Sequence, residues 1–216
     1  MTITTWIDVV ALAARAEAVL AEAAGHVIVD LRRDAWGHGL DLVAPILADV
    51  GVRAARTDAD ARPVAAAAGL TTTAAEPTVD GRFLFGLPDA PVMHATGRVL
   101  STKTLRAGEG VSYGYSHRAP RDTRIALVSG GYAHGIVRAL GNRVTVAVSG
   151  ERRPIVGRVA MDVCVVDIGD ADVHPGTEVT YFGGAASLSE WEAATGMTAE
   201  EMVCAVGLRA HRRDAR

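Results

Sequence analysis

The chain has 216 residues, of which 49% are apolar, and 22 basic and 25 acidic side chains give a formal net charge of −3 at pH 7. This apolar fraction is enough to bury a core, which excludes an intrinsically disordered chain. There is no basic surplus to bind a phosphate backbone, so nucleic acid is not expected as a partner.

The first seventy residues alternate between strand and helix patterns. The predicted elements are a strand (3–10), a helix (11–24), a strand (26–31), a helix (40–50), a strand (52–55) and an alanine-rich helix that ends at Gly69. Asp58 is predicted to cap the last of these helices. Alternation of this kind predicts the beginning of a parallel α/β layer.

The pattern changes after residue 70. Residues 71–91 are rich in threonine, proline and small residues, with one short strand predicted at 83–85. Further strands are predicted at 99–100, 125–128, 144–148, 155–168 and 177–182. Thr198 and Glu201 have capping-box spacing ahead of a closing helix. We therefore expect two domains, residues 1–90 and 91–216, with the strand around Trp6 joining the second.

The cysteines and the first residues bear on the compartment. Cys164 and Cys204 lie far apart in apolar runs and are expected to be free thiols in a reducing compartment. Residues 1–6 lack the basic start and apolar run of a signal peptide, and no apolar run reaches the ~18 residues of a membrane span. A cytoplasmic protein that does not enter membranes is expected.

Four motifs follow one another along the chain. The first is Asp-Ala-Trp-Gly-His-Gly at 34–39, where a predicted strand gives way to a helix. The second is Val-Ser-Tyr-Gly at 111–114, preceded by Lys-Thr-Leu-Arg-Ala-Gly-Glu at 103–109. The third is Gly-Tyr-Ala-His-Gly at 131–135, and the fourth is Pro-Ile-Val-Gly-Arg-Val-Ala-Met-Asp at 154–162.

In this order and spacing, the motifs resemble those of the alanine racemase family. The family's segments read Lys-Ala-(Asp/Asn)-Ala-Tyr-Gly-His-Gly, Gly-Tyr-Ala-Asp-Gly and Pro-Ile-Val-Gly-Arg-(Ile/Val)-Cys-Met-Asp. The resemblance is strong over the β domain, moderate over residues 6–69 and absent between them. It implies an eight-stranded β/α barrel that holds pyridoxal phosphate, followed by a β domain. It also implies a head-to-tail homodimer, in which each β domain supplies a tyrosine to the partner's barrel.

The barrel is expected to be incomplete. A closed β/α barrel takes about 250 residues, whereas only about ninety precede the β domain. The family's arginine and histidine that orient the substrate and the tyrosine belong to the missing middle. The expected fold class is mixed α/β: a truncated α/β layer, the remnant of a β/α barrel, packed on a C-terminal β-barrel-like domain.

Four matched positions depart from the family's cofactor site. Arg32 stands where the resemblance places the Schiff-base lysine, and a guanidinium cannot form that bond. Lys103, the only lysine in the chain, matches a lysine without a catalytic role. Trp36 and Glu200 replace tyrosines that contact the cofactor phosphate, and Val79 replaces the arginine that pairs with the pyridine nitrogen. No cofactor is therefore expected, and no metal.

Residues of the β half match the family better. Tyr113 matches the catalytic tyrosine, Tyr132 the tyrosine that narrows the site entrance, and Met161 the residue whose backbone meets the substrate carboxylate. The expected substrate-binding residues are Tyr132, Met161, Asp162, Arg32 and Trp36. Each also has a structural interpretation: packing at a dimer interface, a strand end, or a solvated charge cluster.

Two histidines are unusual against the family pattern. His134 replaces an aspartate and His117 an aromatic residue. A tyrosine hydroxyl with a pKa near ~10 is a poor acid or base at neutral pH, and a histidine near ~6.5 could assist it. Tyr113, His134 and His117 are therefore the candidate catalytic residues. Either histidine could equally be a surface or hydrogen-bonded core residue.

Three functions stay open from the sequence. The preferred one is an enzyme of isomerase, epimerase or cyclase type that acts on a small metabolite without pyridoxal phosphate, with Tyr113 as acid/base. The second is a non-catalytic binding or regulatory protein that uses the racemase dimer surface. The third is residual racemase activity with loosely bound cofactor. The expected partners are a small-molecule ligand and a second copy of the chain.

Overall fold

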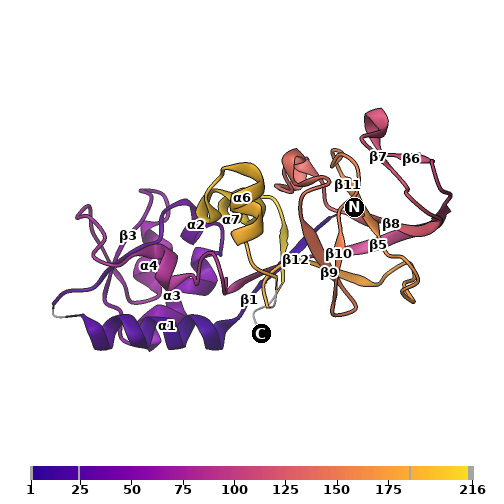
Figure 1. The fold of residues 1–216 in the computed structure, drawn as a ribbon. Coiled ribbons are helices and arrows are strands. Elements are labelled where there is room, and N and C mark those ends of the chain that lie inside the picture. The colour runs from indigo at the N-terminus through magenta and orange to yellow at the C-terminus, as the bar shows by residue number, and fades with distance from the viewer. Residues whose placement is uncertain (1, 24, 185, 214–216) are drawn as a thin grey trace.

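The computed structural model describes residues 2–23, 25–184 and 186–213. The molecule is elongated, with a small parallel sheet and its helices at one end and an antiparallel β structure at the other (Figure 1). This arrangement confirms the mixed α/β fold class. One apolar core includes residues of both parts, and the domain boundary near residue 90 stays a prediction. No described helix combines the length and apolar character needed to cross a membrane.

The α/β layer has three parallel strands and three main helices, which follow the predicted order as far as residue 69. The third strand was not predicted. The strands are β2 (Ile28–Asp30), β3 (Ala54–Arg56) and β4 (Thr71–Thr72), and the helices are α1 (Val9–Glu22), α3 (Leu40–Asp49) and α4 (Arg62–Ala67). The Asp8 carboxylate accepts a hydrogen bond from Ala11 N at 2.8 Å and caps α1. Leu12 and Ala16, one turn apart on α1, are buried in the core.

The chain itself covers one edge of this short sheet. Thr78 Oγ1 accepts a hydrogen bond from Ile28 N at 2.9 Å, and Ile28 O accepts one from Thr78 N at 2.9 Å. Thr78 thereby pairs with the edge of β2 that β3 does not occupy. An open sheet edge can pair with another chain. The contact with Thr78 occupies this edge at the position where a complete barrel would have its next strand.

The strand predicted at 83–85 is wrong, because residues Gly81–Leu84 form the helical turn α5. The Asp80 side chain caps it by accepting a hydrogen bond from Arg82 N at 2.9 Å. Leu84 and Phe85 are buried against the α/β layer. Apolar residues on two sides of a single turn resemble a buried strand in sequence, and periodicity cannot distinguish the two over so few residues.

The predicted Asp58 cap is also wrong. Helix α4 begins at Arg62, with Pro63 in its first turn and no side-chain cap. The Asp58 carboxylate instead accepts a hydrogen bond from Arg33 N at 2.6 Å. The Asp58 carboxylate therefore accepts a hydrogen bond from the amide of Arg33, which is distant in sequence, and not from an amide in the first turn of α4.

Six strands form the β-barrel-like part. They are β5 (Met93–Leu105), β8 (Thr123–Ser129), β9 (Thr145–Val148), β10 (Glu151–Pro154), β11 (Val163–Asp167) and β12 (Glu178–Phe182). Pairing runs β10-β9-β12-β5 and continues from β5 through β8 to β11. A bridge between Ile155, just after β10, and Val166 of β11 joins the two ends. Val146 and Val148 are buried inside, as their alternation predicts.

The long strand predicted over residues 155–168 is interrupted. Ile155 bridges to Val166 of β11, and Val156 N donates to Val165 O at 2.8 Å. Regular strand pairing, of β11 with β8, begins only at Val163. Gly157 has a φ of +75°, in the left-handed region that turns the chain away. The residues between pair with another loop instead, since Ala160 O accepts a hydrogen bond from Tyr132 N at 3.0 Å.

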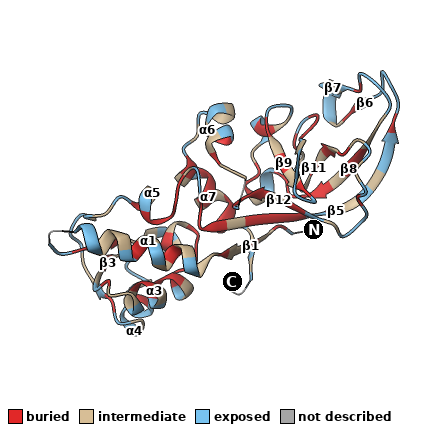
Figure 2. Cartoon of the chain, turned by 60° about the horizontal axis from the view of Figure 1, so that its bottom comes forward, coloured by how far each residue is buried: buried red, intermediate tan, exposed pale blue. Residues whose placement is uncertain are grey.

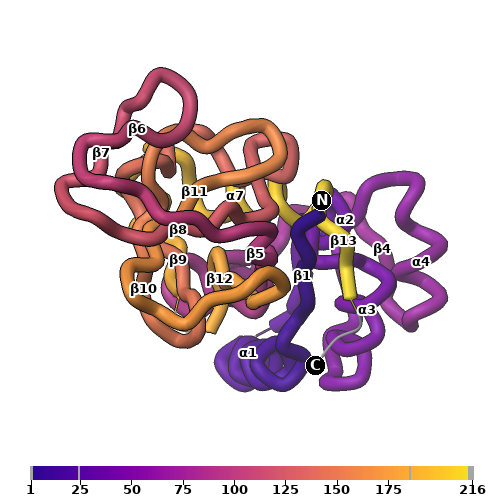
Figure 3. Tube along the Cα trace, turned by 90° about the vertical axis from the view of Figure 1, so that its right-hand side faces the viewer, coloured from indigo at the N-terminus to yellow at the C-terminus, as the bar shows by residue number. Residues whose placement is uncertain are grey.

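The first strand joins the β half, as predicted for the segment around Trp6. Strand β1 (Thr4–Ile7) pairs antiparallel with β5, and β13 (His211–Arg212) lies parallel to β1 (Figure 3). At this joint the Trp6 ring stacks on His94 with centroids 3.7 Å apart. The two ends of the described chain thus connect the α/β layer to the β structure.

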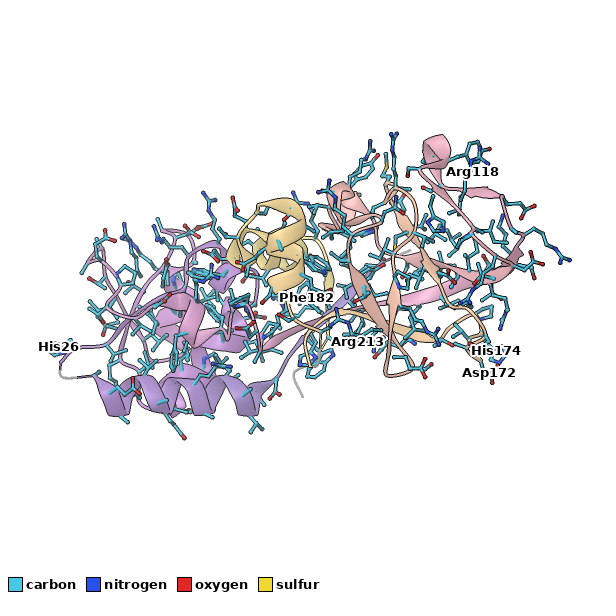
Figure 4. All side chains as sticks on the ribbon, viewed as in Figure 1. His26, Arg118, Asp172, His174, Phe182 and Arg213 are labelled. Carbon is cyan, nitrogen blue, oxygen red and sulfur yellow. The ribbon has the colours of Figure 1, made fainter. Side chains whose placement is uncertain are left out.

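Two helices and an arm complete the fold. Helices α6 (Ser189–Thr195) and α7 (Ala199–Gly207) lie between the two parts, and the predicted capping box of α7 is present. Phe182, near the middle of the molecule in Figure 4, meets Trp191 of α6 edge-to-face with centroids 5.6 Å apart. Strands β6 (Gly110–Val111) and β7 (His117–Arg118) form an arm at the far end, with many exposed residues (Figure 2).

Candidate functional site

Tyr113 lies at the tip of this arm, in the 3-10 turn η1 (Tyr113–Tyr115). Ser112 Oγ donates a hydrogen bond to Arg158 O at 2.6 Å and fastens the turn to the segment after β10. Gly114 has a φ of +73°, and a Cβ there would lie 3.3 Å from the Arg158 guanidinium. The tip of the arm is thus fastened to this segment, while Tyr113 is 74% exposed.

A groove of about 580 Å³ lies between η1 and the outer face of β5, β8 and β11. The strand register places Ser101, Leu127 and Val165 side by side across its floor. Lys103 is opposite Ile125 in the next row of the same face. We call this cavity the tyrosine groove, and the lining residues used below are Ser101, Lys103, Tyr113, Leu127, Arg158 and Val165.

The two candidate histidines lie outside the lining of the tyrosine groove. His117 is on β7, and its Nε2 is buried without a hydrogen-bond partner among the described residues. His134 closes the turn η2 (Tyr132–His134), where its Nδ1 accepts a hydrogen bond from Gly131 N at 3.3 Å. Within the described chain, neither ring is hydrogen-bonded to the Tyr113 hydroxyl. Their catalytic roles stay predictions.

The structure brings Tyr132, Met161 and Asp162 together. Met161 O accepts a hydrogen bond from Ala133 N at 3.0 Å, and Asp162 O accepts one from Gly130 N at 2.9 Å. A Cβ on Gly131 would lie 2.3 Å from Met161 O, so only glycine fits between these loops. All three predicted residues are exposed on this part of the surface.

The Tyr132 ring has a cationic neighbour. The Arg138 guanidinium lies over it, 4.7 Å from the ring centroid. The tyrosine that the resemblance places at the site entrance is therefore held by a cation–π contact with Arg138.

Arg32 is engaged by a neighbouring carboxylate. Its Nε donates to Asp30 Oδ1 at 2.9 Å and its Nη2 to Asp30 Oδ2 at 2.7 Å, a bidentate ion pair. Burial raises the pKa of Asp30, but hydrogen bonds and the charge of Arg32 outweigh it and hold that pKa below its usual value. The guanidinium at the matched lysine position is therefore neutralised within the chain.

Arg32 opens an unusual backbone turn, α2 (Arg32–Trp36). Its last four residues have φ values of 54°, 57°, 52° and 57°. Left-handed helix costs roughly 1–2 kcal/mol per non-glycine residue, so outside contacts must hold it. Asp34 provides them: Oδ1 accepts from Leu40 N at 2.7 Å, and Oδ2 accepts from Arg212 at 2.5 Å.

This turn directs Trp36 onto Gly81 of α5. A Cβ on Gly81 would lie 2.4 Å from the indole, and the Trp36 and Phe85 ring centroids are 5.5 Å apart. The indole that replaces a phosphate-contacting tyrosine therefore packs on the turn that closes the α/β layer.

Pyridoxal phosphate, the cofactor that the resemblance implies, does not fit the residues around Arg32. A cavity of about 450 Å³ there is lined by Asp30, Asp58, Glu200 and Glu201 as well as Arg32 and Arg33. Glu200 pairs with Arg82 at 2.6 Å, and Arg82 also reaches Glu192 at 3.1 Å. Four carboxylates against two arginines leave this lining with a net negative charge, which opposes a phosphate. The one lysine is on β5 in the other half of the molecule.

His38 is a fully buried polar residue of the α/β half. Its ring stacks on Phe85 with centroids 4.0 Å apart, and its Nδ1 lies 2.8 Å from Ala35 O. Burial lowers the pKa of His38 to about 4. Backbone hydrogen bonds and Asp34 act against this shift, and the positive charge of Arg212 adds to it.

We expect His38 to make the fold sensitive to acid. An unfolded histidine has a pKa near ~6.5, so between pH ~6.5 and ~4 the unfolded chain takes up a proton that the folded chain refuses. Neutral His38 therefore has no cost to the free energy of unfolding above pH ~6.5. That free energy falls by about 3 kcal/mol as the pH approaches 4. Urea unfolding of the wild type and His38→Gln at several pH values measures this difference. If the free energy of unfolding falls equally with pH in the wild type and His38→Gln, His38 is not the cause of the acid sensitivity.

Within one chain the two groups of predicted site residues lie apart. Arg32 and Trp36 are on α2 in the α/β half, whereas Tyr113 is on the arm at the opposite end (Figure 1). Joining them in one site requires a second copy of the chain.

Sequence reasoning missed Lys103 and Arg158 as residues of the groove lining. The available signals were that Lys103 is the only lysine and that Arg158 lies within the fourth motif. Neither signal reveals that strand register and the Ser112 contact place both beside Tyr113.

The second half of the chain matches a known family. A family model described as alanine racemase, C-terminal domain, matches residues 92–214. The alanine racemase of Salinispora arenicola is 34% identical over 234 residues, covering 95% of this chain and 60% of that protein. The alanine racemase of Mycobacterium tuberculosis is 43% identical over 119 residues, covering 52% of this chain and 31% of that protein. The chain thus spans only part of the length of these relatives.

Solved structures resemble the whole described fold. Alanine racemase from D-cycloserine producing Streptomyces lavendulae has a TM-score of 0.84 at 19% identity, over 100% of this chain and 97% of that chain. The Bartonella henselae alanine racemase, described with covalently bound pyridoxal phosphate, has a TM-score of 0.79 at 18% identity, over 99% of both chains. At these identities the likeness concerns the fold.

Proposed function

The chain belongs to the alanine racemase family, and we propose that it is a member that does not racemise alanine with pyridoxal phosphate. Instead it binds a small molecule in the tyrosine groove and moves a proton with Tyr113, in a reaction of isomerase, epimerase or cyclase type. The observation that supports this most is the groove itself, which has Tyr113 in its wall.

The loss of racemase chemistry rests on side chains that are already occupied. Arg32 is bound to Asp30, and Glu200 is bound to Arg82. To hold the cofactor, the chain would have to break ion pairs and bring a phosphate among carboxylates. It would still lack an amine at position 32.

The tyrosine groove has the features of a small-molecule site. Its volume of about 580 Å³ lies within the range of roughly 300–1,000 Å³ for such pockets. Leu127 and Val165 give an apolar floor, while Tyr113 supplies a hydroxyl that can donate or accept a proton. An apolar cavity with a few convergent polar groups is where binding and proton transfer are first sought.

Equilibrium dialysis against a small-metabolite extract tests the proposal. Mass spectrometry should find at least one compound retained by the wild type and lost from Leu127→Arg, which places a charge on the groove floor. Val64→Arg is the matched control, because Val64 is an exposed apolar residue of α4, outside the groove lining. A retained set that is the same for all three proteins would refute groove binding.

We expect the protein to form homodimers. Tyr113 and Met161 are 74% and 54% exposed in one chain, and the resemblance implies that both lie near the subunit boundary. Sedimentation across a concentration range should show a dimer at micromolar protein, weakened by Met161→Glu and unaffected by Val64→Glu. A wild-type monomer at that concentration would contradict the expectation.

A non-catalytic binding role is the second candidate. It is favoured by the 74% exposure of Tyr113 and by the contact of His134 with Gly131 instead of with the tyrosine. In this case the groove and the dimer surface act without turnover.

The cysteines support the proposal of a cytoplasmic protein. Cys164 and Cys204 are free thiols, and burial raises the pKa of each to about 11. Unpaired cysteines of this kind are typical of a reducing compartment.

A further inference from the structure

We propose that the ligand of the tyrosine groove is a small amphipathic carboxylate, with an apolar body and one anionic head. This inference rests on the proposed function, since it names the chemical class that the same groove binds. It follows from the charges and the floor of the groove.

The floor is built to cover an apolar body. Leu127 and Val165 are neighbours in register on β8 and β11, and both are only partly buried. On the opposite face of β8, Ala126 and Val128 are fully buried in the core. The outer face therefore leaves apolar surface within reach of solvent under the arm, and covering it with a ligand is favourable at roughly 25 cal/mol per Å².

The charged groups of the groove are all cationic. Lys103 and Arg158 line it, and no Asp or Glu does. Within the described chain, neither the Lys103 ammonium nor the Arg158 guanidinium makes a hydrogen bond or ion pair. Arg32, Arg82 and Arg212, in contrast, are paired with carboxylates. The chain as a whole has a net charge of −3. Two unpaired cations beside an apolar floor are complementary to an anion with an apolar body.

The hydrogen-bond donors of the groove indicate which anionic group the ligand carries. The Arg158 guanidinium lies beside Gly114 in the η1 turn, and its planar fork matches a carboxylate through two parallel hydrogen bonds. Lys103 adds a point charge from β5, and the Ser101 and Tyr113 hydroxyls lie in the same groove. A cationic or purely apolar ligand would leave both cations unpaired.

The only lysine of the chain gives a direct readout. Reductive methylation with formaldehyde and cyanoborohydride modifies Lys103 and the terminal amine, and mass spectrometry separates the two. Octanoate should slow methylation of Lys103 at least fivefold and leave the terminal amine unchanged. 1-Octanol and octyltrimethylammonium, matched in apolar length, should need at least tenfold higher concentrations. Arg158→Met should raise the octanoate requirement about tenfold, whereas Arg121→Met, an exposed arginine outside the groove lining, should not.

Each other outcome has a distinct meaning. Equal protection of Lys103 by all three octyl compounds would refute the inference that the ligand is a carboxylate. It would leave the proposal of ligand binding in the groove unaffected. No protection, together with no groove-dependent compound in dialysis, would overturn both the ligand class and the proposed function. If the dimer protects Lys103 fully without any octyl compound and octanoate adds nothing, the second copy fills the groove, which also overturns the proposal.

Discussion

Pyridoxal phosphate and borohydride are expected to leave the purified protein without a stoichiometric phosphopyridoxyl adduct, and the mixture should not racemise alanine. Arg32 stands at the matched lysine position and is bound to Asp30 through two hydrogen bonds of 2.9 and 2.7 Å. An arginine cannot form the Schiff base. Loss of the covalent link removes the chemistry entirely, so the expected effect is all-or-none.

A full-length alanine racemase treated in parallel is the positive control. Lys103→Arg removes the only lysine of this chain, so any incidental labelling of that amine should disappear in the variant. A single adduct on Lys103 accompanied by alanine racemisation would contradict the expectation and revive the racemase interpretation.

The α/β half shows where periodicity succeeds and where it fails. Helix α3 was predictable, because Val43 and Leu47 repeat at helical spacing and both are buried. The turn α5 was not, because its position depends on the Trp36 indole resting on Gly81, forty-five residues away in sequence. A contact of that range leaves no local pattern.

The β half was predictable mainly through its motifs. Residues 131–135 and 154–162 identified the family, and the alternation of Val146 and Val148 identified β9. The break after Ile155 was missed, because apolar residues continue through a segment that turns at Gly157. Composition alone could not show that Ala160 and Met161 pair with the η2 turn.

The candidate site was predicted in part. Tyr113 was singled out by its motif, and it lines the groove. The histidines were chosen because they depart from the family pattern and could assist a tyrosine. The His134 ring contacts Gly131, and both catalytic roles stay predictions. Lys103 and Arg158 reach the groove from β5 and from the turn before β11, through register and a loop contact that a sequence does not display.

Tyr113→Phe is expected to abolish most turnover of the groove ligand while changing stability little. Removing the hydroxyl of a side chain that is 74% exposed deletes at most one net hydrogen bond, about 1 kcal/mol. Removing a proton-transfer group typically lowers a rate ~100- to 10,000-fold. The expected loss of rate is much larger than the expected loss of stability. Measuring kcat and urea unfolding on one preparation therefore distinguishes a catalytic from a structural tyrosine.

Tyr115→Phe is the matched control for this experiment. Tyr115 belongs to the same turn, lines the same groove and is 63% exposed. Its ring packs over Gly110, a contact that loss of the hydroxyl leaves in place. Turnover should therefore survive in Tyr115→Phe. His134→Gln or His117→Gln should reproduce the rate loss of Tyr113→Phe only if that histidine assists the proton transfer, which tests their predicted catalytic roles.

The outcome for Tyr113 decides between the two candidate functions. If the phenol moves a proton, Tyr113→Phe binds octanoate with nearly wild-type affinity, because the anion is held by Arg158 and Lys103 and not by the phenol. Binding is then retained while kcat falls, which is the signature of a group used in the transition state. If the wild type and Tyr113→Phe bind the groove ligand equally and neither protein turns it over, the tyrosine has no part in chemistry. The groove then belongs to a binding protein built on the racemase fold.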